Sequence, residues 1–517
     1  MASIVSASIY SSQSRFSKDA ASALFNSRFS NWSYHDINGL FKTFGRGPRP
    51  TKDVDNASLA EVANEDKIEA VVDEKNLIVE WSLLKKSLHM IVPLGLVFAS
   101  SLAATSITAN TRDIYEDLHG APIISTLPYS LYIIGLAVGS LTGNAASELF
   151  PRRETLFVTA PLFALCQLAL GLFRRFGLIL AFRLLSGLFA STASIVSYGI
   201  VCDMWMENKR TVPTALFFAS SFLGATIGPL FGGIIGERLS WRWTQLMFTF
   251  LTVPIMVATF YSRETTSTPN DEKTPFKLAA QVSLFIRLTL GRPIMLIFTK
   301  PSILFLGLTT GFSVAIQYAL YTTLPTVFSG TYHLTWLTES LCFLSLSIGV
   351  LLGMSIHILQ HLRLYASLTI YWRKSLTSSE AHTQPQAFPA RYRLIPALPI
   401  VLLLPLSLVL FAFTVVPGYS IFIPLSFVIF LALCCFLLFI SSLLYIQDEF
   451  RDNERGSAVG GFLFVVYLVG AGLPTISTVL LDRLHLTGMF GVLAAGSLVL
   501  GSAVIVFWMK GKRKGAV

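Results

Sequence analysis

Charged residues are scarce in this sequence of 517 residues. Asp, Glu, Lys and Arg make up 13% of it, against roughly 25% in a soluble globular domain, whereas 53% of the residues are hydrophobic. The composition therefore predicts that most of the chain lies in a lipid bilayer. The net charge of +10 does not indicate nucleic-acid binding, because the basic residues stand between apolar stretches, as they do in loops that flank membrane spans.

Other absences exclude further classes of protein. The five cysteines all fall in apolar segments and form neither a metal-type spacing nor an extracellular disulfide set, so we expect them to be buried as small hydrophobic residues. The sequence has no glycine-rich phosphate-binding motif and no nucleophile–base set in a polar domain. We therefore expect a protein that is not an enzyme, that binds no metal or cofactor, and that draws its energy from an ion gradient or from the gradient of its own substrate.

The sequence does contain many apolar stretches that are long enough, at about 20 residues, to cross a bilayer. They cover roughly residues 88–110, 122–143, 155–173, 177–204, 211–236, 242–261, 302–327, 336–358, 395–415, 420–446, 457–480 and 487–508. We predict an all-α membrane protein with twelve transmembrane helices in two six-helix bundles, at residues 87–261 and 302–509, on either side of a polar central loop at 262–301. Two halves of six spans are typical of secondary transporters.

The segments between the spans predict the orientation of the chain. With the N-terminus inside, the cytosolic segments hold 23 Lys and Arg residues and the outer segments hold six. Because basic residues gather on the cytosolic side, we expect a multi-pass protein of the cell membrane with both termini in the cytosol. Residues 1–86, Ser-rich and then acidic, are predicted to be a disordered tail rather than a mitochondrial presequence, and residues 510–517 a basic tail.

The predicted spans have no Asp or Glu in their middle, and Arg183 in span four is their only intramembrane charge. A lone cation costs at least about 2.5 kcal/mol near the centre of a bilayer, so such a residue indicates a functional role. The alternative is that Arg183, which lies about one turn inside the span, reaches the headgroups with its long side chain.

Two stretches in the first half carry distinctive patterns. Residues 139–156, GSLTGNAASELFPRRETL, place Glu148, Arg152 and Arg153 at the cytosolic end of span two, where they can pair with neighbouring helix ends and hold a gate closed. The alternative for the two arginines is simple anchoring at the cytosolic face. Residues 221–243, SFLGATIGPLFGGIIGERLSWRW, place a glycine at every fourth position of span five together with Pro229. This spacing favours close helix packing, and the proline favours a bend.

With these residues the chain resembles the major facilitator superfamily and, within it, the fungal drug:proton antiporter family with twelve spans. The first stretch is similar to that family's G-P-L-x-x-x-P-L-S-E-x-x-G-R-R pattern, with agreement at Gly139, Leu141, Ser147, Glu148, Arg152 and Arg153. It departs from the pattern at Asn144, Ala145, Ala146 and Pro151. The second stretch fits the family's antiporter motif, G-x-x-x-G-P-x-x-G-G, in full at Gly224, Gly228, Pro229, Gly232 and Gly233, and W-R-W follows at 241–243.

The resemblance implies roles for further residues. Arg183 and Gly187 match the family's R-x-x-x-G pattern, in which the arginine is linked to proton coupling. Asp203 matches an acidic residue that pairs with the gate arginines, although a solvated carboxylate at a helix end is the simpler alternative. The second half resembles the family more weakly, at residues 292–306, 317–328, 392–398 and 469–475. There Gln317, Tyr318 and Tyr321 stand in the middle of span seven, where they line either a substrate cavity or a packing face.

The resemblance thus implies a secondary active transporter that exports small, largely apolar or cationic compounds, such as drugs, toxins or fungal secondary metabolites. It would work by proton antiport and alternating access, as a monomer whose partners are its substrate, protons and the lipid bilayer. A polyamine exporter is the second hypothesis, weakened by the scarcity of intramembrane carboxylates. A sensor or scaffold that does not transport is the third, and the departures at Asn144 and Pro151 favour it.

Overall fold

The computed structural model describes residues 81–111, 114, 122–206, 209–261, 283–365, 389–450 and 452–514. Within these residues the chain is helical and forms no strand. Most of the predicted N-terminal tail, part of the predicted central loop and the last residues of the C-terminal tail lie outside the described residues.

The helices of the first half agree with the predicted spans to within a few residues at most ends. They are α4 (Leu83–Thr105) with its 3₁₀ extension η1 (Ser106–Asn110), α6 (Pro122–Leu149), α7 (Arg152–Leu172), α8 (Phe176–Met204), α9 (Thr211–Arg238) and α10 (Trp241–Tyr261). Five of them contain a proline, namely α4, α6, α7, α9 and α10. Prolines are tolerated inside membrane helices because neighbouring helices and side chains satisfy the backbone groups that they leave free.

The second half continues the same architecture. It comprises α13 (Pro301–Tyr332), α14 (Trp336–Gln360) with the π turn η4 (His361–Tyr365), the 3₁₀ helix η5 (Ala390–Ala397) leading into α16 (Ile400–Thr414), α17 (Phe422–Glu449) and α18 (Asp452–Lys514). The last of these is two helices joined at a kink, because His485 has a φ of 56°. By length and composition, ten described helices can cross a membrane if α18 is taken as one. The division of α18 and the addition of α10 bring the described spans to twelve, as predicted.

The predicted central loop is partly helical. A π turn, η3 (Arg287–Gly291), leads into the short helix α12 (Arg292–Thr299), which packs on α18. Leu296 and Ile297 are buried in that contact, whereas Phe298 is exposed. This segment is helical because apolar residues follow Pro293 at the start of the helix and pack against a neighbouring span.

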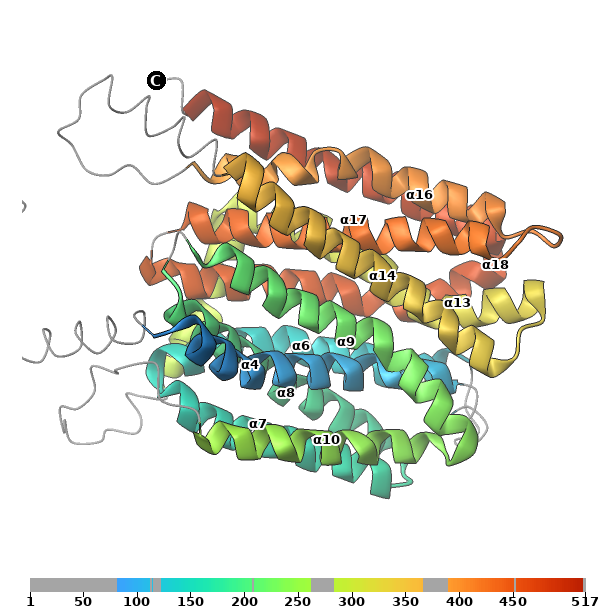
Figure 1. The fold of residues 1–517 in the computed structure, drawn as a ribbon, viewed down its shortest axis with the longest axis horizontal. Helices are drawn as coiled ribbons and strands as arrows, with labels where there is room; N and C mark the ends of the chain where they lie inside the picture. Colours follow the sequence, from blue (N-terminus) through green and yellow to red (C-terminus); the bar gives the residue numbers. More distant parts are fainter. Residues whose placement is uncertain are drawn as a thin grey trace, which may run out of the picture. The chain divides into compact units, whose positions relative to one another are not determined.

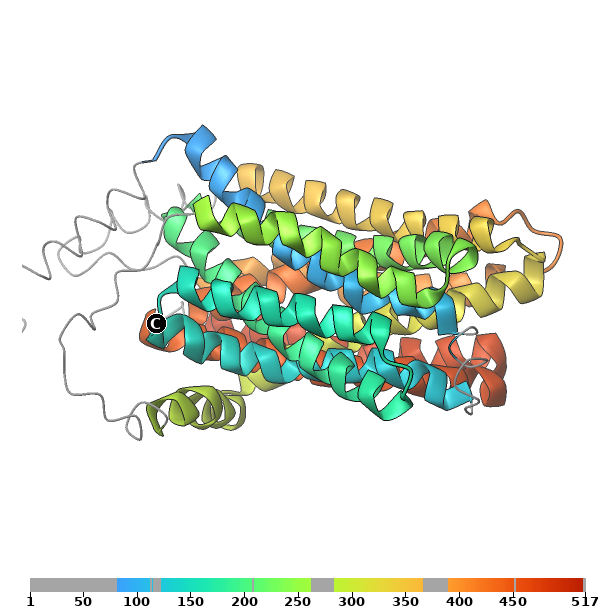
Figure 2. The ribbon, with the colours of Figure 1, turned by 90° about the horizontal axis from the view of Figure 1, so that it is seen from below.

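The helices run alongside one another (Figures 1 and 2), and the two halves repeat the same neighbour relations. In the first half α4 packs on α9, α6 on α8, and α7 on α10. In the second half α13 packs on α18, α14 packs on α17, and α16 also packs on α18. The halves meet where α9 packs on α14 and where α6 packs on α18.

Helix α9 contacts both halves through its glycines. An added Cβ at Gly224, Gly228 or Gly232 would collide with Phe98, Thr105 or Ser106 respectively, all in α4 and η1. Gly233 faces the other way, toward the Ser340 side chain of α14. The glycine face therefore serves close packing with span one, and Gly233 extends it to the second half. Pro229 is buried between these contacts.

The end of span one is fitted to the same face. Asn110, which is 3% exposed, donates a hydrogen bond from Nδ2 to the Gly232 carbonyl at 3.0 Å. Its Oδ1 lies where a side chain at position 236 would stand, so Gly236 makes room for it. Asn110 was not predicted from the sequence as part of this contact.

We expect Gly232→Ala to destabilise the protein by about 1–3 kcal/mol, because the new methyl group overpacks a tight backbone contact. The measurement is the apparent Tm of purified protein in detergent. The control is Gly177→Ala, where a Cβ meets nothing within 4 Å. Equal effects of the two substitutions would contradict the assigned contact.

Candidate functional site

The predicted gate residues gather at the end of the bundle where α6 meets α7, here called the basic end. Arg152, the first residue of α7, forms an ion pair with Asp203 near the end of α8. The Arg152 guanidinium fits there because Gly199 has no side chain, since a Cβ at that position would lie 2.7 Å from Arg152 Cζ. The structure thus brings together Arg152 and Asp203, as the sequence predicted.

The other two gate residues have different neighbours. Glu148 lies beside Gly456 of α18, so it reaches the second half of the chain. The guanidinium of Arg153 lies 5.2 Å from the centre of the Phe157 ring, within its own helix. The departure at Asn144 also falls on the interface between the halves, because its Nδ2 atom fills the space beside Gly460 of α18. Nearby, Ser140 donates a hydrogen bond to the Gly460 carbonyl at 3.2 Å.

The departure at Pro151 does not disturb the gate. Pro151 is the N-cap of α7 with a φ of −55°, an ordinary value for proline. Among the described residues other than glycine, positive φ occurs only at Ser240, His333 and His485. The turn between α6 and α7 therefore does not require the glycine that the family pattern has there.

Arg183 lies inside the first bundle and is fully buried. Its Nη1 donates to the Ala103 carbonyl of α4 at 3.1 Å, and its guanidinium lies 5.8 Å from the centre of the Tyr132 ring of α6. Nε and Nη2 have no hydrogen-bond partner among the described residues. Arg183 therefore does not extend to the headgroups. It joins α8 to α4 and α6, and no described carboxylate forms a salt bridge with it.

A cavity of about 50 Å³ lies between the two halves at mid-height. The first half contributes a wall of small hydroxyl side chains, which are Ser100, Ser101, Thr105, Ser191, Ser194 and Ser221. The facing wall is aromatic and amide-bearing, formed mainly by Gln317, Tyr318 and Tyr321 of α13 and by Tyr467 of α18. All three cavity residues predicted from the sequence thus line it. Tyr129 of α6 and the serine wall were missed.

The described lining contains no Asp, Glu, Lys, Arg or His. The space is also much smaller than the roughly 300–1,000 Å³ of a pocket for a drug-sized ligand. Hydrogen bonds also join the halves at two pairs of helices, α6 with α18 and α9 with α14. Ser130 and Thr475 share one at 2.8 Å, and Thr226 of α9 and Ser347 of α14 share another at 2.8 Å. The walls must therefore separate before a ligand of that size can enter.

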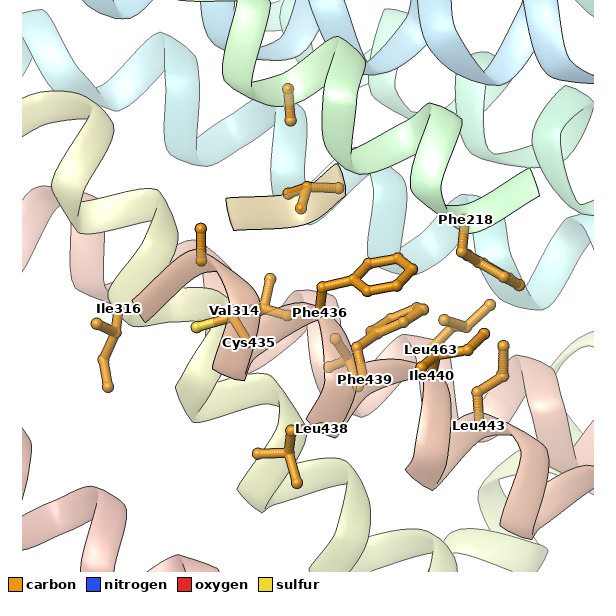
Figure 3. Packing of buried hydrophobic residues seen from close by; sticks show 14 of the residues in the cluster. Phe218, Val314, Ile316, Cys435, Phe436, Leu438, Phe439, Ile440, Leu443 and Leu463 are labelled. Atoms are coloured by element: carbon orange, nitrogen blue, oxygen red, sulfur yellow. The ribbon is translucent and has the colours of Figure 1, made fainter. Parts of the chain in front are cut away.

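A second cavity, of about 350 Å³, opens at the basic end and is lined by Glu148, Arg152, Tyr198 and Asp203 among others. An aromatic layer separates it from the central cavity. Phe218 of α9 lies with its ring centre 5.1 Å from that of Phe439 of α17. Figure 3 shows Phe218 at the interface between the halves, near the segment of α17 that carries Phe439.

The aromatic rings of this layer contact one another all the way from the second cavity to the central cavity. Tyr198, which lines the second cavity at the basic end, contacts Phe217 and Phe218, which line the central cavity. Phe222 contacts Phe436 and Phe439 across the two halves, with ring centres 5.4 and 5.2 Å apart. Sequence reasoning missed this layer because phenylalanines in an apolar helix look alike whether they face lipid, core or cavity.

Two helical halves around a small polar cavity, with a gate of paired charges and aromatic rings at one end, have the architecture of a secondary transporter. Residues 92–474 match the family model of the Major Facilitator Superfamily, and the chain belongs to that superfamily.

Relatives and solved structures agree with this assignment. The chain is 26% identical over 439 residues to the MFS-type transporter traF of Penicillium crustosum, covering 81% of this chain and 86% of traF. It is 23% identical over 471 residues to mrr1 of Monascus ruber, the MFS transporter of the citrinin biosynthesis cluster, covering 85% and 89%. The protein is thus a multi-pass membrane transporter and not an enzyme.

The fold is shared with two solved transporters. The crystal structure of the human organic anion transporter MFSD10 matches with a TM-score of 0.57 at 15% identity, covering 81% of this chain and 99% of that one. The peptide transporter POT matches with a TM-score of 0.59 at 16% identity, covering 85% and 99%. At these identities the likeness concerns the fold alone.

We expect Asp203→Asn and Arg152→Gln to be non-additive, because each substitution removes the same ion pair. The double variant should differ from the sum of the single variants by about 0.5–3 kcal/mol in unfolding free energy. Thermal unfolding of the four proteins measures this coupling. The additive control combines Asp203→Asn with Glu237→Gln. Glu237 lies on α9, at the end of that helix far from the basic end. Additivity of the Asp203 and Arg152 variants would contradict a stable pair.

We expect Phe218→Ala to open a path from the basic end to the central cavity. The measurement is the rate at which a hydrophilic thiol reagent modifies the cysteine introduced by Ser194→Cys. The protein also carries Cys202→Ala, because Cys202 lines the second cavity. The rate should rise several-fold. Phe490→Ala, which removes a buried ring that contacts Phe411 in the second half, should not change it. An equal rise in both variants would indicate general loosening rather than a gate.

Proposed function

We propose that this transporter exports small, largely apolar or cationic organic compounds, such as drugs, toxins or secondary metabolites, from the cytosol by alternating access. The central cavity carries the proposal, because it lies between the halves and has a neutral lining with hydroxyl, amide and aromatic groups. Relatives named as transporters of fungal biosynthesis clusters support this substrate class. The complete glycine motif in α9 supports the export direction, as in the drug:proton antiporter family that the chain resembles.

In this proposal the basic end faces the cytosol of the cell membrane, since Lys and Arg gather on the cytosolic side of membrane proteins. The Arg152–Asp203 pair, Glu148 and the aromatic layer then form the cytosolic gate. The antiporter-motif glycines act as the close contact of α9 with span one, about which the gate opens and closes. The working unit is the monomer, because one chain contains both halves.

We also propose that export is coupled to protons and that Arg183 takes part. Its burial without a salt-bridge partner among the described residues supports this role, because a lone charge in the bilayer is costly to retain unless it serves a function. Polyamine export is disfavoured, since a polycation needs carboxylates and the described cavity lining has none. The intact Arg152–Asp203 pair disfavours a scaffold that has lost its gate.

The test is uphill accumulation of two fluorescent dyes, one neutral and one cationic, by energised inside-out vesicles that contain the protein. A protonophore should abolish accumulation, and Arg183→Ala should lower its rate about tenfold or more through the loss of charged hydrogen bonds. Arg183→Lys should retain part of the rate, and Arg238→Ala, an exposed arginine at the end of α9, should retain all of it.

Thermal unfolding of Arg183→Ala checks that the variant is folded. Accumulation that survives the protonophore would refute proton antiport and indicate facilitated diffusion. If neither dye and no compound of a broad panel moves, export itself is refuted.

A further inference from the structure

The central cavity carries two buried polar atoms that no neighbour satisfies. The Tyr129 hydroxyl and the Gln317 Oε1 atom both lack a hydrogen-bond partner among the residues that the structure describes, although Tyr129 is fully buried and Gln317 is 1% exposed. Both residues line the cavity, one from α6 in the first half and one from α13 in the second. Because buried polar atoms are nearly always paired, two unpaired atoms on the lining of one cavity indicate a place where a ligand binds.

Several other polar groups of the lining are already hydrogen-bonded to one another or to the backbone. Ser101 and Ser221 share a hydrogen bond at 2.8 Å, and Ser100 donates to the Val97 carbonyl at 3.0 Å. The Gln317 amide donates from Nε2 to the Tyr321 hydroxyl at 2.9 Å, which orients the amide and leaves its oxygen without a described partner. A ligand therefore meets two buried lining groups without a described partner, the Gln317 Oε1 atom, which accepts, and the Tyr129 hydroxyl, which can donate.

The lining also restricts charge and shape. No described lining residue is an Asp, Glu, Lys, Arg or His. Arg183, the buried arginine of the first bundle, does not line the cavity. A charged ligand would lose its hydration without gaining a counter-ion. The Tyr129 and Tyr318 rings meet edge to face with centres 6.0 Å apart, and Tyr318 and Tyr321 follow at 6.1 Å. Such rings favour contact with a flat, conjugated molecule.

We infer that the substrate is an uncharged, planar, oxygenated compound that accepts a hydrogen bond from Tyr129 and donates one to Gln317. This inference rests on the proposed export function and narrows its substrate class to neutral molecules. A carbonyl oxygen suits Tyr129, and a hydroxyl or N–H group suits Gln317. Because the two residues belong to different halves, such a ligand bridges them, and its binding acts directly on the contact that transport must open and close.

The experiment compares four probes on one planar scaffold by equilibrium binding to the purified full-length protein. The probes are hydroxymethylanthraquinone, which is neutral and has both groups, methylanthraquinone, which lacks the donor, anthraquinone sulfonate, an anion, and trimethylammoniomethylanthraquinone, a cation. The hydroxymethyl probe should bind most tightly, by about three- to tenfold over the methyl probe. Its advantage over both charged probes should be roughly a hundredfold.

Substitutions assign the effect to the two residues. Tyr129→Phe and Gln317→Leu should each weaken binding of the hydroxymethyl probe about three- to tenfold, and Gln317→Leu should remove its advantage over the methyl probe. Gln317→Glu should improve binding of the cation, because it places a carboxylate in the neutral lining. Tyr332→Phe, on α13 but outside the lining, is the matched control and should bind as the unchanged protein does.

Charged probes that bind as tightly as the neutral one would overturn the inference. So would a lack of binding by all four probes, or an absence of effect in both Tyr129→Phe and Gln317→Leu when thermal unfolding shows them folded. These results leave the proposed function standing if vesicles still export other compounds. Failure of export for every compound in vesicles would instead refute the proposed function itself.

Discussion

The close backbone contact between α9 and span one is the constraint on which the rest of the structure depends. Glycines at 224, 228 and 232 allow α9 to approach α4 and η1 until side chains at those positions would collide with the opposite helix. This contact fixes the rotation of α9. Its other faces then direct Phe218 toward α17, Ser221 toward the cavity and Gly233 toward α14. A membrane helix without a hydrophobic driving force for association relies on such packing for its position.

The spans, the gate pair and the close-packed face could all be predicted from the sequence, and the spans and the face depend on local features alone. A span needs only a long apolar run, and the glycine pattern repeats at a helical period. The pairing of Arg152 with Asp203 could be predicted although the two residues are distant in sequence, because the family pattern includes both. The roles of these residues in gating and of Arg183 in coupling stay predictions.

The cavity could be predicted only in part, because a helix that is apolar on every side gives no periodic signal for which face meets lipid. Tyr129 and Tyr132 illustrate this. They stand one turn apart on α6, yet Tyr129 lines the cavity whereas Tyr132 donates to the Ser100 carbonyl and lies beside Arg183. Only the packing of the neighbouring helices distinguishes them. The helical part of the central loop was missed for a related reason, since its apolar residues are too few to register as a span.

The small volume of the central cavity has a consequence for the direction of the cycle. In the arrangement described, hydrogen bonds join the halves at two pairs of helices, and the space between the halves is too small for a drug-sized molecule. An unloaded transporter can pass through this arrangement, whereas a loaded one must pass through a wider one. On the proposed cycle this compact form therefore belongs to the return stroke. Its stability, more than the affinity for cargo, then governs how fast the transporter resets when cargo is abundant.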